Sequence, residues 1–272
     1  MSTTAKPIKW HGGKHYLAKR IVAMMPPHTH YTEAFAGGLS VLLAKSPDGV
    51  SETVNDLYGP LRNFWQVLAS EALFDEFHRR LEATPLSELV FDEADGEFDG
   101  MDRVSKAVMF FVRARMSRQG LMKDYTTPTT RTRRGMNEQV SAWLTAVDGL
   151  PDVHARLRRV EIRSEDAVQF LRRYDHAKAL HYCDPPYLHE TRSTTGEYAC
   201  EMDEEKHAEL LSMLAEAKGK FILSGYRSDL YDDWATRCGW NRVDVPIDNK
   251  ASASRKKEQR VECLWMNFDA DT

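Results

Sequence analysis

Apolar and polar residues alternate along the chain with two different periods, and these periods predict strands followed by helices. Short segments, several of them apolar and followed by glycine or aspartate, predict strands at Tyr31–Phe35, Ser51–Asn55, Arg158–Ile162, Ala179–Cys183, Lys220–Ser224 and Val261–Phe268. Apolar stripes with helical spacing predict helices over Leu39–Lys45, from Leu57 onward, and over Val104–Met116, Asp166–Tyr174 and Asp203–Ala217. Because strands that alternate with helices form βαβ units, we expect an α/β fold with a mostly parallel sheet.

The segment from about Ser70 to Asp152 interrupts this alternation, and its charge is unevenly distributed. Ser70–Asp102 holds eleven acidic residues against two basic ones, and Arg103–Arg134 holds nine basic residues against one acidic one, although the whole chain has a net charge of only -4. A further basic run, Lys250–Arg260, holds five basic residues and one glutamate. Charge runs are often solvated faces, but two basic runs near Gly, Ser and Thr favour loops that contact phosphates. We therefore expect an inserted second domain.

Composition excludes several classes of protein. The 272 residues are 42% hydrophobic and 29% charged, which is typical of a folded chain and not of a disordered one. No stretch reaches about 18 consecutive apolar residues, and the first residues lack the apolar segment of a secretory signal, so we expect a cytoplasmic protein without a membrane span. The four cysteines lie far apart without a C-x-x-C spacing, so we expect free thiols and no zinc site.

Glycine and carboxylate residues follow the predicted strands, where sites in parallel sheets form. The turn Phe35–Ser40 contains Gly37 and Gly38, which allow a tight turn and a close approach of a ligand to the backbone. Asp56 lies 19 residues after Gly37 at the end of the next strand, where a carboxylate can accept the hydroxyls of a ribose. Asp56 could instead cap the following helix. The pair indicates a cofactor that carries a nucleoside.

The strongest signal is Asp184-Pro185-Pro186-Tyr187, directly after the strand Ala179–Cys183. The two prolines stiffen a turn that presents a carboxylate, a backbone carbonyl and a flat ring, and these groups suit a planar ring with an exocyclic amino group. A second cluster, Lys9-Trp10-His11-Gly12-Gly13-Lys14, is either a basic tail or a loop that covers a cofactor.

These motifs, in this order and with these gaps, resemble the Dam-type (D12 class) adenine-specific DNA methyltransferases. The resemblance rests on KWHGGK at 9–14, FAGGL at 35–39, Asn55-Asp56, DPPY at 184–187, LSGY at 223–226 and LWMNF at 264–268, and it spans nearly the whole chain. It implies an α/β, Rossmann-like S-adenosylmethionine-dependent methyltransferase fold with a mixed, mostly parallel seven-stranded sheet, formed by residues 1–69 and 153–272. It also implies a mainly helical target-recognition domain inserted at residues 70–152.

The resemblance implies roles for individual residues. The DPPY residues Asp184, Pro185, Pro186 and Tyr187 would act on the N6 amino group of an adenine flipped out of double-stranded DNA, without a metal. The cofactor S-adenosylmethionine would contact Trp10, Lys14, Glu33, Phe35, Gly37, Gly38, Asp56, Asp166 and Asp184, with Glu165 as the alternative to Asp166. Leu39 departs from the family pattern, in which a small residue or glycine is common at this place in the turn.

The basic runs are expected to bind DNA through Arg113, Arg115, Arg118, Lys123, Arg131, Arg133, Arg134, Arg255, Lys256 and Lys257. We expect a monomer or a weak dimer on DNA. Methylation of RNA adenine or of the cytosine N4 group remains an alternative, as does a catalytically silent, prophage-type DNA-binding protein. A nucleotide-binding oxidoreductase is disfavoured because no Rossmann glycine fingerprint is present. The target sequence and a role in restriction-modification stay open, although GATC is common among similar enzymes.

Overall fold

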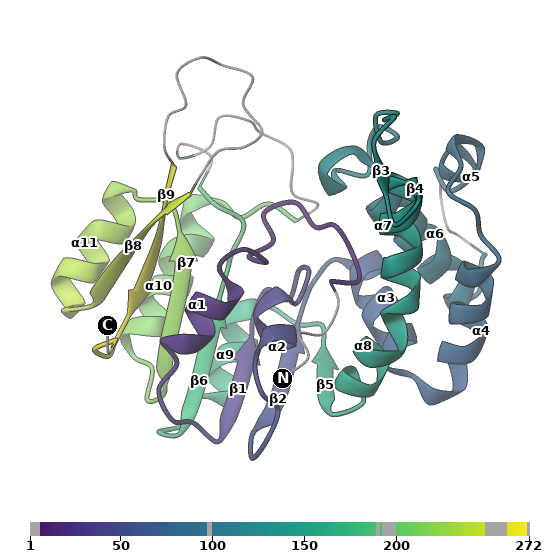
Figure 1. Ribbon diagram of the computed structural model, residues 1–272. Coiled ribbons are helices and arrows are strands. Elements are labelled where there is room, and N and C mark those ends of the chain that lie inside the picture. Colours follow the sequence, from purple (N-terminus) through teal and green to yellow (C-terminus); the bar gives the residue numbers. More distant parts are fainter. Residues whose placement is uncertain (1–5, 97–99, 189–190, 192–199, 248–259, 271–272) are drawn as a thin grey trace. The chain divides into compact units, whose positions relative to one another are not determined.

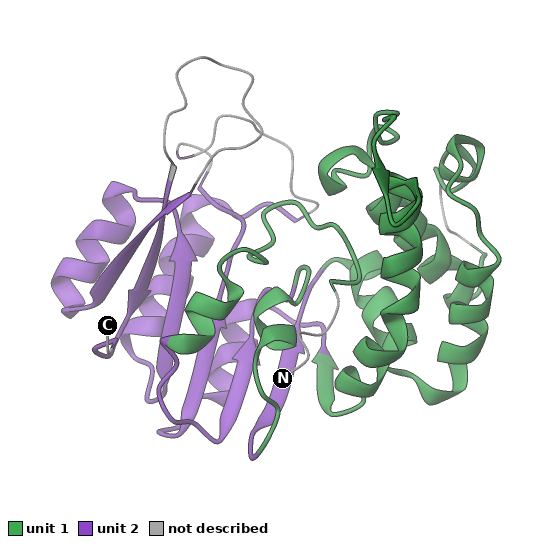
Figure 2. Cartoon of the chain, in the orientation of Figure 1, with its two compact units in different colours: residues 1–23, 37–48, 58–162 green, residues 24–36, 49–57, 163–272 purple. Residues whose placement is uncertain are grey.

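The computed structural model describes residues 6–96, 100–188, 191, 200–247 and 260–270 (Figure 1). The chain divides into two compact units (Figure 2). Unit 1 contains Met1–Ala23, Gly37–Asp48 and Tyr58–Ile162, and unit 2 contains Met24–Ala36, Gly49–Leu57 and Arg163–Thr272.

Within the described residues, the main sheet has seven strands in the order β5-β2-β1-β6-β7-β9-β8. β1 pairs in parallel with β2 and β6, and β6 pairs in parallel with β7, whereas β9 runs antiparallel to both β7 and β8. This arrangement confirms the predicted mixed, mostly parallel seven-stranded sheet. The strands are β1 (His30–Glu33), β2 (Ser51–Asn55), β5 (Val160–Arg163), β6 (Ala179–Cys183), β7 (Lys220–Gly225), β8 (Asn241–Ile247) and β9 (Arg260–Met266).

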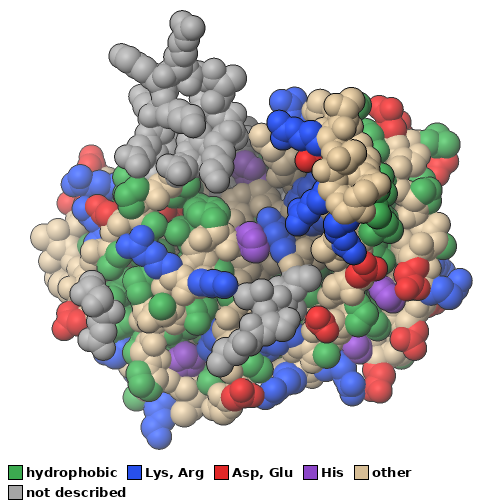
Figure 3. All heavy atoms as spheres, viewed as in Figure 1, with side chains coloured by type: hydrophobic (Ala, Val, Ile, Leu, Met, Phe, Trp, Pro, Cys, Tyr) green, Lys and Arg blue, Asp and Glu red, His purple; other side chains and the backbone are tan. Residues whose placement is uncertain are grey.

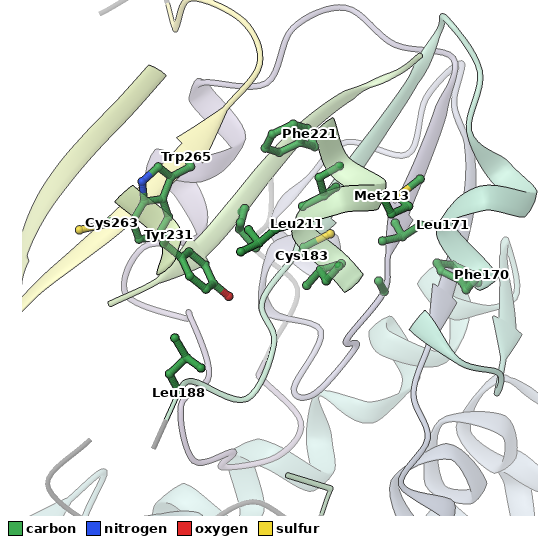
Figure 4. Packing of buried hydrophobic residues seen from close by; sticks show 14 residues of the cluster. Phe170, Leu171, Cys183, Leu188, Leu211, Met213, Phe221, Tyr231, Cys263 and Trp265 are labelled. Atoms are coloured by element: carbon green, nitrogen blue, oxygen red, sulfur yellow. The ribbon is translucent and has the colours of Figure 1, made fainter. Parts of the chain in front are cut away.

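Strand register places an apolar set of side chains on one face of the sheet in unit 2. Cys183 pairs with Leu223, and Leu223 pairs with Trp265, so these three side chains share that face. They pack against Leu171 and Leu211 from the helices in one buried cluster (Figure 4). The helices of unit 2 are α9 (Ala167–Tyr174), α10 (Glu204–Ala215) and α11 (Asp229–Cys238).

Unit 1 is mainly helical and has an aromatic core. The Phe64 ring lies 5.4 Å from that of Phe110 and 6.1 Å from that of Phe111, and Phe111 in turn lies 5.4 Å from Trp143. Aromatic rings bury large apolar areas, so this cluster stabilises the unit. The elements are α1 (Ala18–Ala23), α2 (Ser40–Ala44), α3 (Gly59–Ala69), α4 (Glu71–Glu82), α5 (Glu88–Glu93), α6 (Arg103–Met116), η1 (Arg118–Gly120), β3 (Thr132–Arg133), β4 (Met136–Asn137), α7 (Glu138–Asp148) and α8 (Leu150–Leu157).

Two elements of unit 2 are absent from the sequence prediction for physical reasons. α11 buries only Tyr231 of its ten residues, so its apolar stripe is too thin to indicate a helix. β8 lies at the edge of the sheet, where most of its side chains are exposed or half-buried. It also contains Pro246, which an edge strand tolerates but which argues against a central strand.

Candidate active site

The DPPY turn follows β6 in unit 2 and holds an aromatic ring beside a carboxylate. Asp184 is half-buried, Pro185 is buried, and Tyr187 is only 6% exposed. The Tyr187 hydroxyl donates a hydrogen bond to the carboxylate of Glu262 and lies 3.4 Å from Asp184 Oδ1. The ring of Tyr226 meets the Tyr187 ring edge-on at 4.6 Å. The ring and the carboxylate of the turn are therefore fixed relative to one another.

Burial is the main reason that the pKa of Tyr187 lies well above its ordinary value, and the neighbouring Asp184 and Glu262 carboxylates raise it further. The side chain thus stays a protonated phenol near neutral pH. It acts as a hydrogen-bond donor and as a flat apolar surface, not as an anion.

Asn55 connects the carboxyl ends of strands β1 and β2 with the segment before α9. Its Nδ2 donates to the backbone oxygens of Ala34, at 3.1 Å, and Glu165, at 3.0 Å, and its Oδ1 accepts from the Glu165 amide at 2.8 Å. The side chain is 1% exposed. Asn55 thereby holds together the backbone segments that carry Phe35, Asp56 and Asp166. The sequence motif includes Asn55, but its linking role is visible only in the structure.

The two acidic residues before α9 differ in their surroundings. Asp166 is exposed, and its Oδ1 caps the helix by accepting from the amides of Val168 at 3.0 Å and Gln169 at 3.1 Å. Glu165 instead pairs with Arg173 at 2.9 Å and Arg163 at 3.3 Å. The hydrogen bond from Arg173, followed by that from Arg163, lowers the pKa of Glu165.

Strand β1 and the segment after it contribute two more of the predicted residues. Glu33 is buried, and its Oε1 accepts a hydrogen bond of 2.8 Å from the Tyr31 hydroxyl. Phe35 is half-buried and packs against the apolar cluster of unit 2. Asp56, also half-buried, directly follows β2, and its amide donates to Arg163 O at 3.4 Å. Unit 2 therefore gathers Glu33, Phe35, Asp56, Asp166, Asp184 and Tyr187 at the carboxyl ends of its strands.

Unit 1 brings the other two motifs together, around Trp10. A Cβ at Gly37, whose φ is +45°, would lie 2.8 Å from Trp10 Nε1, and a Cβ at Gly38 would lie 3.0 Å from Trp10 Cβ. The positive φ and the short distance favour glycine at position 37, and Trp10 leaves little room for a larger residue at position 38. Trp65 Nε1 donates to Gly37 O at 3.0 Å. Leu39, where the sequence departs from the family pattern, adopts a left-handed φ of 51° and is fully buried.

Lys14 is 4% exposed, and its Nζ donates to Gly12 O at 2.9 Å. Lys9 Nζ donates to Ser117 O at 3.4 Å, so the KWHGGK segment from Lys9 on is part of the folded unit and not a basic tail.

Comparison with known proteins decides the family. The profile described as "D12 class N6 adenine-specific DNA methyltransferase" matches residues 10–246. The chain belongs to this family. The resemblance predicted from the motifs is thus confirmed, and the fold is a Rossmann-like methyltransferase fold.

Other comparisons add little. No curated protein matches the sequence. A solved structure, the precorrin-6y C5,15-methyltransferase of Geobacter metallireducens GS-15, is similar with a TM-score of 0.37 and 6% identity, over 93% of this chain and 85% of that one. Among the described residues, no helix is long and apolar enough to cross a membrane. In the same part of the chain, no three His, Cys, Asp or Glu side chains group as metal ligands would.

Several of the cations that the sequence predicts as DNA contacts lie at one hairpin of unit 1. β3 and β4 are joined by Arg134 and Gly135, both with positive φ, as a two-residue hairpin turn requires. Arg131, Arg133 and Arg134 are exposed, and Arg134 donates to Thr145 Oγ1 at 2.9 Å. Figure 3 shows Lys and Arg side chains gathered over this hairpin.

The remaining predicted DNA contacts occupy different surroundings. Arg118 and Lys123 are exposed. Arg113 is buried, lies 3.9 Å from the centre of the Phe91 ring, donates to Phe91 O at 3.2 Å and pairs with Asp95 at 3.3 Å. These contacts give Arg113 a structural role within unit 1. Arg255, Lys256 and Lys257 lie outside the described residues.

A cavity of about 250 Å³ in unit 1 is lined by basic residues of the KWHGGK segment and of the Arg103–Arg134 run. Arg115 lies beside it, donates to Ala142 O at 2.8 Å, and has a buried Nε without a hydrogen-bond partner among the described residues. Burial lowers the pKa of Arg115 to about 10. Lys9, which the sequence places in a separate motif, lines the cavity together with Arg115 and Arg133, because the fold brings these distant segments together. The lining residues are Lys9, Leu86, Arg115, Thr126, Arg133, Glu138, Gln139, Ala142 and Trp143.

Proposed function

We propose that this chain is a site-specific DNA adenine methyltransferase that transfers a methyl group from S-adenosylmethionine to N6 of an adenine flipped out of double-stranded DNA. Family membership supports adenine methylation of DNA. The observation that carries the finer proposal is the DPPY turn, in which a half-buried carboxylate and a fixed aromatic ring stand side by side. Such a pair suits the amino group and the flat ring of a purine.

The residues at the strand ends fit the cofactor chemically. Asp56 offers a carboxylate to ribose hydroxyls, as acidic residues at the end of a second strand do in nucleotide-binding folds. Asp166 is favoured over Glu165 for the cofactor's adenine, because Arg163 and Arg173 already hold the Glu165 carboxylate. Trp10 packs directly on the Gly37-Gly38 turn, and we propose that its ring and this turn together contact the cofactor. We also propose Lys14, Glu33 and Phe35 as part of this cofactor site.

The chemistry required of the protein is alignment and charge stabilisation. S-adenosylmethionine, when bound, supplies a methyl group that its sulfonium already activates. The N6 lone pair of adenine is delocalised into the ring and is a poor nucleophile. The Asp184 carboxylate and the Pro185 carbonyl can accept hydrogen bonds from the two N6 protons and favour a pyramidal nitrogen, and these hydrogen bonds strengthen as positive charge develops. One of the two protons leaves to water once N6 carries the methyl group. Stacking on Tyr187 would offset part of the cost of flipping, a few kcal/mol.

The test is a product assay. The purified chain is incubated with radiolabelled S-adenosylmethionine and unmethylated double-stranded DNA, and the product is digested to nucleosides. We expect the label in N6-methyldeoxyadenosine. Label in N4-methylcytosine, or label only when RNA is supplied, would overturn the substrate assignment. Absence of transfer together with retained DNA binding would indicate the silent DNA-binding protein instead.

Asp56→Ala is expected to weaken S-adenosylmethionine binding by roughly 10- to 100-fold, because two hydrogen bonds to a charged carboxylate would be lost. Isothermal titration calorimetry measures the change. Asp233→Ala, which removes an exposed carboxylate on α11, is the matched control and should bind the cofactor as the wild type does. Equal affinities in the two variants would exclude a ribose contact by Asp56.

DNA affinity should depend on pH through Lys9. Burial, together with the nearby charges of Arg115 and Lys6, lowers the pKa of Lys9 to about 8. Lys9 is therefore charged below pH 8 and loses its charge above it, so affinity should fall between pH 7 and pH 9 as an attraction to phosphate disappears. Fluorescence anisotropy with a labelled duplex, at constant ionic strength, measures this.

Lys9→Met should flatten that pH dependence, whereas Lys123→Met, at an exposed lysine, should leave it unchanged. An equally steep pH dependence in Lys9→Met would show that another group is responsible.

A further inference from the structure

Glu262 is a buried acidic residue that the proposed chemistry does not use. It lies on β9, is 1% exposed, and accepts hydrogen bonds from the Tyr187 hydroxyl and, at 2.6 Å, from Ser224 Oγ. A buried carboxylate is costly unless hydrogen bonds compensate it, so its presence behind the DPPY turn requires a reason.

The sheet register explains why these groups meet. Ser224 pairs with Leu264 across β7 and β9, and Glu262 lies two residues from Leu264, so Ser224 and Glu262 project from the same face. The intervening Gly225 and Cys263 pair on the opposite face, and Cys263 belongs there to the apolar cluster. One face of the strand pair therefore packs the core, and the other carries a polar contact for the turn after β6.

We propose that Glu262, held by Ser224, is a positioning residue for methyl transfer, because it fixes the hydroxyl end of the Tyr187 ring on which the target base stacks. This inference rests on the proposed function. The backbone of the turn determines only the Cβ end of the side chain, and the hydroxyl contact restrains the far end. A ring held at both ends loses little further freedom when the base arrives.

The same contact determines where the Tyr187 proton points. A phenol has one proton, and Tyr187 has two carboxylates within reach, Glu262 and, at 3.4 Å, Asp184 Oδ1. Because Glu262 accepts the hydrogen bond from this proton, the phenol does not compete with the amino protons of the base for Asp184. The pKa of Tyr187 is raised by burial and by both carboxylates, so the proton stays on the phenol. Tyr182 is a second phenol near Glu262, and burial with the neighbouring carboxylates raises its pKa as well.

Glu262→Gln tests this arrangement with little change of shape. The amide can donate to the Tyr187 oxygen, which turns the phenol proton toward Asp184, where it competes with the amino protons of the base. We expect kcat to fall about tenfold or more, while KM for DNA and the affinity for S-adenosylmethionine stay within about twofold. Steady-state methylation kinetics and calorimetry on the full chain give these values.

Tyr187→Phe removes the hydroxyl but keeps the ring, and it separates positioning from a general loss of stability. If Glu262 acts through that hydroxyl, then Glu262→Gln in the Tyr187→Phe background lowers kcat no further. Glu52→Gln is the matched control, because Glu52 is also buried in the sheet but lies on β2. It is expected to change the melting temperature without changing kcat.

An activity-independent readout uses duplexes with 2-aminopurine at the target position, whose fluorescence rises when the base leaves the stack. Glu262→Gln should alter the intensity in the complex, and Glu52→Gln should not. Wild-type kcat in Glu262→Gln, or effects that multiply independently in the double variant, would overturn the inference while the proposed function stands. A wild-type chain that methylates no adenine would end both.

Discussion

Asp184→Ala is expected to lower the rate of methyl transfer to adenine by about 1,000-fold, the size of effect seen when a catalytic site loses a hydrogen-bonding group that stabilises developing charge. Its carboxylate is the acceptor in the DPPY turn that can hold an N6 proton while the nitrogen gains positive charge. The half-buried side chain makes the loss larger than at an exposed position, because water replaces the carboxylate poorly there. Single-turnover transfer of radiolabelled methyl groups to a duplex measures the rate.

The affinities of Asp184→Ala for S-adenosylmethionine and for DNA distinguish a chemical defect from a binding defect, and we expect DNA affinity to change little. Asp184→Asn keeps the shape of the side chain and one acceptor oxygen. Its NH2 group cannot accept a hydrogen bond from N6 and repels the N6 protons, so a rate between those of the wild type and Asp184→Ala is expected. Methyl transfer at the wild-type rate in Asp184→Ala would eliminate the mechanism.

Local patterns predicted the part of the fold that carries the strand-end residues. The strands at Ser51–Asn55 and Ala179–Cys183 have the predicted bounds, because each is a short segment followed directly by an aspartate. The helix that Asp166 caps was predicted to begin at that residue, since aspartate before an apolar stripe is a strong start signal. Strand ends and helix caps depend on a few consecutive residues, so they can be predicted from the sequence alone.

The sequence indicated less in the charged middle of the chain. α4 buries Phe74, Phe77 and Leu81 along one side, but the acidic residues between them obscure this stripe. For Arg113, the charge pattern predicted a DNA contact that its burial does not favour. It belongs to a basic run, yet it lies on the buried side of α6, and charge counts do not distinguish the two sides of a helix. Glu262 could not be identified either, because its contact with Tyr187 spans 75 residues and depends on strand register.

Asn55→Ala is expected to lower the free energy of unfolding by about 3 kcal/mol and to weaken S-adenosylmethionine binding about tenfold or more. Three hydrogen bonds of a fully buried side chain would be lost, which leaves the Ala34 and Glu165 backbone groups without them. Since these groups hold the segments that carry Phe35, Asp56 and Asp166, the cofactor residues would lose their common anchor. Thermal and urea unfolding give the stability, and calorimetry gives the affinity.

Asn267→Ala is the matched control, because Asn267, which follows β9, hydrogen-bonds the backbone at the start of β7. Asn267 accepts from the Phe221 amide at 3.0 Å and donates to Gly219 O at 3.0 Å, so its loss also removes backbone contacts of an asparagine side chain. These contacts lie at the amino end of a strand, whereas Asn55 lies at a carboxyl end. Asn267→Ala should therefore reduce stability and leave cofactor affinity unchanged. A parallel loss of affinity in both variants would mean that Asn55 acts only through stability.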